Sequence, residues 1–119
     1  MADYSEAKIQ QVWEKGTIVP QYDSNKYRKD SCGAWIQRDQ YGYEGTLGWN
    51  IDHVFPASKG GKEELENLRP MNWANNRSKG YDFPTYSCAV ESNGNENVST
   101  DKELTVNESL KDILSNRYQ

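Results

Sequence analysis

The sequence predicts an α+β fold, because strand-like segments in the middle of the chain lie between helical patterns at its two ends. Its 119 residues match the size of a single domain. Aromatic residues make up 12% of the chain and include four Trp, so the modest apolar content does not indicate disorder. We therefore expect a small folded core built on Trp13, Trp35, Trp49 and Trp73.

Each end of the chain is predicted to form an amphipathic helix, over residues 4–15 and 105–119. Ser5 and Asn107 can cap the N-termini of these helices, and Gly16 can end the first. The apolar residues of each helix recur at helical spacing: Ile9, Val12 and Trp13 in the first, and Val106, Leu110, Ile113 and Leu114 in the second.

Residues 49–80 are predicted to run strand, long loop, strand, helix. WNIDHVF carries β-branched and aromatic residues and predicts a strand. PASKGGKEELEN follows as a loop, and LRPM predicts a second strand whose Pro70 favours an edge position. In NWANNRSKG, Asn72 can cap a helix that Gly80 closes. We place residues 1–90 in one domain, read the polar residues 91–104 as a flexible linker or loop, and leave 105–119 as a C-terminal helix.

The bulk properties predict a cytoplasmic protein. The N-terminal residues lack the basic and apolar regions of a signal peptide, and no apolar run reaches the roughly 20 residues of a membrane span. Cys32 and Cys88 could form one disulfide, but we expect two reduced thiols. The net charge of −4 gives no global basic field for nucleic acid.

The residues with candidate chemistry surround His53, the chain's one histidine, which follows Asp52 directly. Neighbouring side chains on a strand point to opposite faces, so the two do not simply bond each other. A lone histidine is more often structural than catalytic. Here, however, Asn67 follows His53 by fourteen residues and Asn76 follows Asn67 by nine, which is a pattern rather than an isolated side chain.

With its DH pair, P-x-S-x-GG turn, N-L-x-P and N-x-x-K, the stretch 49–80 resembles the HNH endonuclease family, and the resemblance extends over about residues 12–83. The resemblance implies a ββα-metal (HNH or His-Me finger) core between the N-terminal and C-terminal helices. The site residues it implies are His53 as general base, Asn67 as the residue that ties the loop and orients the histidine, and Asp52 and Asn76 as metal ligands. Asn75 is the adjacent rival to Asn76, which we prefer because Lys79 then completes N-x-x-K.

The implied activity is metal-dependent hydrolysis of DNA phosphodiester bonds, leaving 5′-phosphate and 3′-hydroxyl ends. Two hard oxygen ligands suit Mg²⁺, with Mn²⁺ as the alternative. We expect no structural zinc, since the CxxC pairs that hold it in many HNH proteins are absent from the sequence. Arg77, Lys79 and Lys59 are the candidate contacts to DNA phosphates.

The expected partner is DNA, with no membrane, and the protein is expected to be a monomer or a homodimer. A catalytically silent ββα module that binds nucleic acid or protein is the alternative. The mild acidity of the chain favours that alternative, since a nuclease with little basic surface binds DNA weakly. A secreted nuclease toxin is a third interpretation, which lacks support from a basic charge or a translocation domain.

Overall fold

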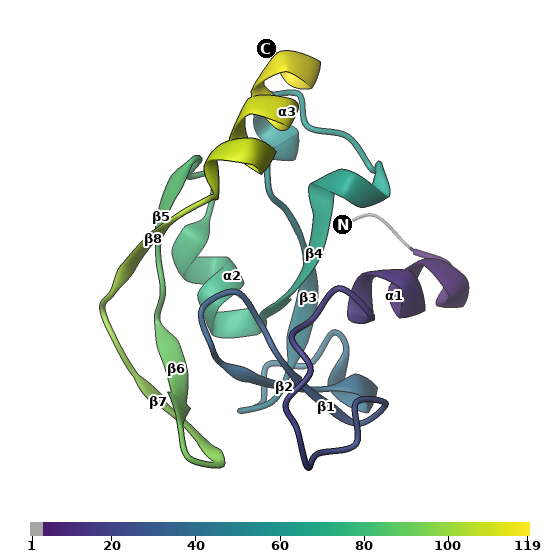
Figure 1. The fold of residues 1–119 in the computed structure, drawn as a ribbon, viewed down its shortest axis with the longest axis vertical. Coiled ribbons are helices and arrows are strands. Elements are labelled where there is room, and N and C mark those ends of the chain that lie inside the picture. The colour runs from purple at the N-terminus through teal and green to yellow at the C-terminus, as the bar shows by residue number, and fades with distance from the viewer. Residues whose placement is uncertain (1–3) are drawn as a thin grey trace.

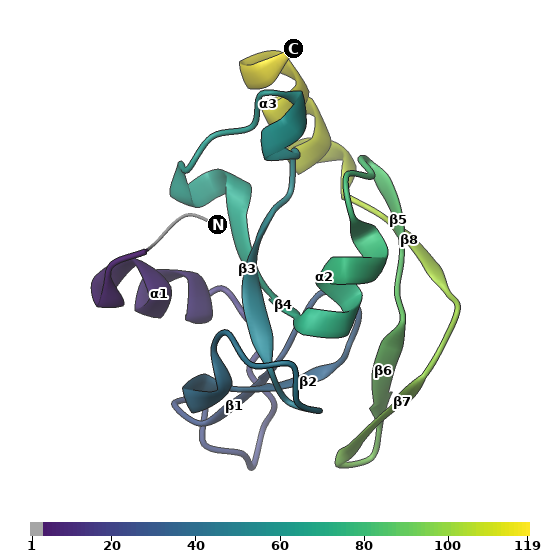
Figure 2. The same cartoon turned by 180° about the vertical axis from the view of Figure 1, so that it is seen from behind.

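Strands β3 (Trp49–His53) and β4 (Leu68–Asn72) form an antiparallel pair at the centre of the computed structural model, which describes residues 4–119. Helix α2 (Trp73–Lys79) begins directly after β4 and packs against both strands, as Figures 1 and 2 show from opposite sides. The predicted order of strand, loop, strand and helix is therefore confirmed.

Helix α2 begins and ends at the residues that the sequence indicates. The side-chain oxygen of Asn72 accepts a hydrogen bond from the Ala74 N–H at 2.9 Å, as an N-cap does. Gly80 follows the helix with a positive φ of 54°, a conformation that glycine adopts at little cost. These local signals fix which turn of α2 presents which side chain to the site.

Helix α1 (Glu6–Trp13) and the hairpin of β1 (Tyr27–Lys29) and β2 (Trp35–Gln37) lie around the central pair. The predicted N-terminal helix is confirmed, and Ser5 caps it by accepting from the Lys8 N–H. The buried apolar residues on this side come from α1, β2, β3 and β4: Ile9, Val12, Trp13, Ile36, Trp49, Ile51 and Leu68.

Residues after α2 form two further strand pairs and the last helix. Strand β5 (Thr85–Ser87) pairs with β8 (Glu103–Thr105), and β6 (Val90–Asn93) pairs with β7 (Glu96–Ser99). In Figures 1 and 2 these four strands run as one long ribbon along one side of the molecule, and the ribbon leads into α3 (Glu108–Tyr118).

Residues 91–104, predicted as a flexible linker or loop, contain most of the β6–β7 hairpin instead. The polar composition of this segment did not indicate strands, but β6 and β7 form a hairpin that turns at Gly94, where φ is 65°. The Asn97 side chain anchors this hairpin, since its oxygen accepts from the Trp35 N–H at 2.7 Å and its amide donates to the carbonyls of Trp35 and Thr46. Polar side chains thus hold this segment where apolar burial does not.

The C-terminal helix is confirmed, but it is part of the same core as the central strands. Leu114 of α3 is fully buried. It belongs to a cluster that contains residues from β4 and β5 and from the loop after β3: Cys32, Val54, Phe55, Met71, Tyr86, Cys88, Val106 and Leu114. Cys32 and Cys88 form a disulfide, so the expectation of two free thiols is wrong.

Within residues 4–119 the strands form four two-stranded antiparallel sheets, and with the helices they confirm the α+β class. Short 3₁₀ turns fill the connections: η1 (Arg38–Gln40), η2 (Ala57–Lys59) and η3 (Leu65–Asn67). None of the helices in this range has the length and apolar character that crossing a bilayer requires.

Candidate functional site

Asp52, His53 and Asn76 line one cavity of about 490 Å³, which we call the site cavity. Asp52 and His53 come from the end of β3, and Asn76 comes from the middle of α2, which packs across that strand. His53 and Asn76 also line a neighbouring cavity of about 340 Å³. The structure thus brings together three of the four residues that the sequence singles out, with the imidazole between two open spaces.

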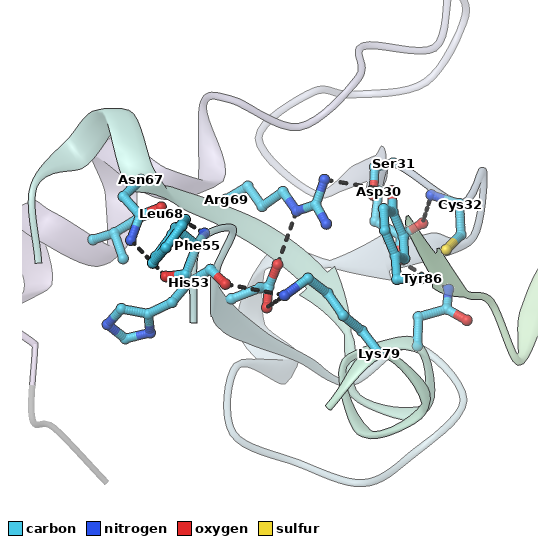
Figure 3. Close-up of polar contacts among 12 residues, drawn as sticks. Asp30, Ser31, Cys32, His53, Phe55, Asn67, Leu68, Arg69, Lys79 and Tyr86 are labelled. Carbon is cyan, nitrogen blue, oxygen red and sulfur yellow. Dashed lines mark hydrogen bonds and ion pairs between the residues drawn. The ribbon is translucent and has the colours of Figure 1, made fainter. Parts of the chain in front are cut away.

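Asp52 is buried between two cations. Its Oδ2 accepts from Nε of Arg69 at 2.9 Å, and its Oδ1 lies 3.4 Å from Nζ of Lys79. Arg69 stands directly opposite Asp52 in the β3–β4 register, while Lys79 reaches the same carboxylate from α2 (Figure 3). These three groups together carry one net positive charge, which favours an anion in the adjacent site cavity.

Lys79 does not lie where a contact to DNA requires it. Its side chain is 0% exposed, and Nζ also donates to the His53 carbonyl at 3.1 Å. Burial lowers the pKa of Lys79, the Arg69 charge lowers it further, and Asp52 opposes both. The expected phosphate contact is therefore wrong, because the lysine is used to join α2 to the end of β3.

His53 is held by Glu63, a residue that the sequence did not single out. Nε2 of the imidazole lies 2.8 Å from Oε1 of Glu63. Burial raises the pKa of Glu63, but hydrogen bonds from Tyr4 and His53 outweigh that effect and hold it below its ordinary value. The carboxylate therefore stays ionised beside the imidazole at neutral pH.

Asn67 ties the loop between β3 and β4, as the resemblance implied. The side chain is fully buried. Its oxygen accepts from the Phe55 N–H at 2.8 Å, and its amide donates to the Phe55 carbonyl at 3.0 Å (Figure 3). The amide also donates to the Lys62 carbonyl at 3.1 Å. Asn67 does not line the site cavity, and the hydrogen bonds of its side chain go to the backbone of the loop.

The structure separates the two neighbouring asparagines of α2. Asn75 is fully buried, donates to Asp30 and to the Val90 carbonyl, and accepts from the Ala89 and Val90 N–H groups. Its amide is thus committed to the framework of the fold. Asn76 lines the site cavity beside Asp52 and His53, a position that favours it over Asn75 as a ligand.

Arg77 and Lys59 are the two remaining candidates for phosphate contacts, and both lie at the surface. Arg77 lines the site cavity and is 68% exposed. Its guanidinium lies over the Trp73 ring and pairs with Glu44 at 2.9 Å. Lys59 is exposed on η2, next to the cavity residue Ser58.

The capacity of the cavity for a metal rests on two side-chain oxygens, those of Asp52 and Asn76. Among the residues that the structure describes, no group of three or more His, Cys, Asp or Glu is arranged to hold an ion. Mg²⁺ commonly takes one or two protein oxygens and completes its shell with water and substrate phosphate. The donor set therefore fits a hard cation of this kind, although Asp52 is already paired with the buried Lys79 and the partly buried Arg69.

Two residues at this site, Glu63 and Tyr4, were missed from the sequence, and Arg69 was considered only for phosphate contacts. The pairing of Arg69 with Asp52 could have been found, because antiparallel pairing of the two predicted strands sets a register that places them opposite each other. Glu63 and Tyr4 carry no such signal, because the path of an irregular loop brings them to His53. No family model matches the chain, and no curated protein or solved structure matches it either.

Proposed function

We propose that this protein is a metal-dependent endonuclease of the HNH type, built on a ββα-metal core, that hydrolyses phosphodiester bonds in DNA. One observation supports the proposal most directly: Asp52, His53 and Asn76 line the same cavity, on a strand pair and helix in the order that the family uses. Asp52 and Asn76 would hold Mg²⁺ or Mn²⁺, which when bound supplies Lewis-acid stabilisation of the phosphate and of the leaving oxygen.

The protein residues supply the remaining steps. His53 accepts a proton from the attacking water, a role that contributes about 10²- to 10⁴-fold in rate. The excess positive charge of Arg69 and Lys79 over Asp52 draws the phosphate to the cavity in a chain whose net charge is −4. Arg77 is positioned at the cavity surface to meet a neighbouring phosphate. Attack of the water at phosphorus breaks the bond to the 3′ oxygen, which takes up a proton from solvent, so the ends are a 5′-phosphate and a 3′-hydroxyl.

The test is cleavage of supercoiled plasmid by purified protein with Mg²⁺ or Mn²⁺. We expect nicked or linear products, loss of cleavage in EDTA, and a loss of at least about 100-fold in His53→Ala. Glu96→Ala, on the exposed ribbon strand β7, is the control and should cut as the unaltered protein does. A histidine variant that cuts at the normal rate would overturn the assignment of the base.

A catalytically silent module that binds nucleic acid or protein is the second candidate. The double ion pair of Asp52 favours it, because both carboxylate oxygens already have a cationic partner. Plasmid that stays intact with either metal at high protein excess would support this candidate and overturn the nuclease. Retarded migration of the same plasmid on a gel would then indicate binding without cleavage.

A further inference from the structure

We propose that Glu63 and Tyr4 form a positioning pair that fixes the tautomer and orientation of His53, so that Nε2 carries the proton and Nδ1 is the free basic nitrogen. The role of this pair in catalysis rests on the proposed function, whereas the arrangement of the three side chains does not. That arrangement is built on the hydrogen bond between Glu63 of the β3–β4 loop and His53 at the end of β3, beside Tyr4 of the N-terminal segment in the same cavity.

The contact between His53 and Glu63 decides which nitrogen is protonated. An ionised carboxylate can only accept hydrogen bonds, and a neutral imidazole has one donor nitrogen and one acceptor nitrogen. Nε2 lies 2.8 Å from Oε1 of Glu63, so Nε2 must be the donor. Nδ1 then keeps its lone pair and can take a proton from water.

Tyr4 is the second residue that interacts with the Glu63 carboxylate. Burial raises the pKa of the Tyr4 hydroxyl, and its hydrogen bond to Glu63 raises it further. The hydroxyl therefore stays protonated and donates to the carboxylate. Tyr4 lies just before α1, and together with Glu63 and His53 it lines the cavity of about 340 Å³. A residue of the N-terminal segment thus reaches the candidate base.

The backbone next to Glu63 is fixed, although the Glu63 side chain is 51% exposed. Gly61 packs so closely on the chain that a Cβ placed there would lie 1.9 Å from the Phe55 carbonyl oxygen. The Lys62 carbonyl accepts from the Asn67 amide at 3.1 Å. These contacts pin the two residues before Glu63, so the loop presents its carboxylate to the imidazole in one place.

The decisive experiment is ¹⁵N NMR of the imidazole at alkaline pH, and it gives one unambiguous signal set because the chain has one histidine. We expect a proton on Nε2, protected from exchange, in the unaltered protein and in Glu63→Gln, whose amide oxygen still accepts. Glu63→Leu should lose the protected proton, and Tyr4→Phe should shorten its lifetime. A proton on Nδ1, or identical spectra for Glu63→Leu and the unaltered protein, would overturn the proposal.

Kinetics provides the second readout. Glu63→Leu should lower kcat about 10- to 100-fold and leave KM unchanged, because positioning accounts for part of the rate that a general base supplies. Glu63→Gln should keep most of the normal kcat. Glu96→Leu is the control, because Glu96 is an exposed glutamate on β7, outside the loop that carries Glu63. A control that loses as much activity as Glu63→Leu would contradict the positioning role.

The two readouts keep the proposals separate. A protected Nε2 proton in a protein that leaves plasmid intact would support the positioning pair and overturn the nuclease. Cleavage with a proton on Nδ1 would support the nuclease and overturn the pair. The spectra need no substrate or metal, so neither result depends on the other.

Discussion

Asp52 is the residue whose surroundings say most about how this site would work. It is buried and paired with both Arg69 and Lys79. A divalent cation that binds Asp52 meets two positive charges, whereas a phosphate that enters the cavity is attracted by them. We therefore expect the metal to bind weakly by itself and more tightly once a phosphate accompanies it.

Asp52→Asn and Asn76→Ala should separate the metal role from the structural one. Removing the carboxylate leaves the buried Lys79 and the partly buried Arg69 without their partner, so Asp52→Asn should lower the free energy of unfolding by about 3 kcal/mol. Asn76→Ala, at a partly exposed position, should change it by less than about 0.5 kcal/mol. Urea denaturation measures both changes, and calorimetry with Mg²⁺ should show weaker binding in each. Equal destabilisation by the two changes would contradict this division of roles.

The pH dependence of stability should report on Glu63. Its pKa lies below the ordinary value, because hydrogen bonds from Tyr4 and His53 outweigh the effect of burial. A carboxyl whose folded pKa is lowered stabilises the fold above its unfolded pKa, and that contribution is lost as the pH falls through the folded value. Glu63→Gln should therefore cost less than about 1 kcal/mol at pH 7, since the group is half exposed. The difference from the unaltered protein should shrink as the pH falls through the folded pKa of Glu63, and a difference that stayed constant down to acid pH would refute this origin.

Among the elements, the hairpin of β6 and β7 depends most on a single residue. Gly94 has φ of 65°, and a Cβ placed there would meet nothing within 4 Å. Gly94→Ala should therefore lower the free energy of unfolding by about 1 kcal/mol through backbone conformation alone. Gly45→Ala is the control, because that position is equally open and its φ is not positive. Urea denaturation of both variants measures the difference, and equal stability of the two would show that the turn tolerates a side chain.

The elements also show what sequence reasoning can and cannot reach. Helix α2 was predictable because its cap at Asn72 and its stop at Gly80 are local. The β6–β7 hairpin was not, because Asn97 bonds to Trp35 and Thr46, far away in the chain. The residues of the candidate site also fall into a group that the sequence could predict and a group that it could not. Spacing along the chain located the predicted site residues, whereas their partners across the loop and the sheet depend on tertiary packing.

At the scale of the whole molecule, the chain folds as one unit rather than as a domain, a linker and a helix. One buried cluster contains Val54 and Phe55 beside the site, Met71 of β4, and Leu114 of α3. Tyr118 of α3 also donates to Glu64 in the loop that carries Glu63. Removal of α3 should therefore disturb the loop as well as the core.

The disulfide is the strongest single constraint on this unit. Cys32 and Cys88 are 56 residues apart, and closing a loop of that length stabilises a fold by up to about 4 kcal/mol in the chain-entropy description. Treatment with a phosphine reductant should therefore lower the free energy of unfolding by about 2 to 4 kcal/mol, as measured in urea. The double variant Cys32→Ala, Cys88→Ala should be less stable from the start and should not respond to the reductant.

Reduction of the disulfide should also affect the candidate site, because Cys32 is hydrogen-bonded to Asp30, which holds the start of α2. Asp30 accepts hydrogen bonds from the backbone N–H of Cys32, from the Asn72 N–H and from the Asn75 amide. Loosening Cys32 therefore loosens the start of the helix that carries Asn76. We expect plasmid cleavage to fall on reduction under conditions where most molecules remain folded. Unchanged cleavage, with the thiols shown to be free, would mean that Asp30 holds α2 without help from the disulfide.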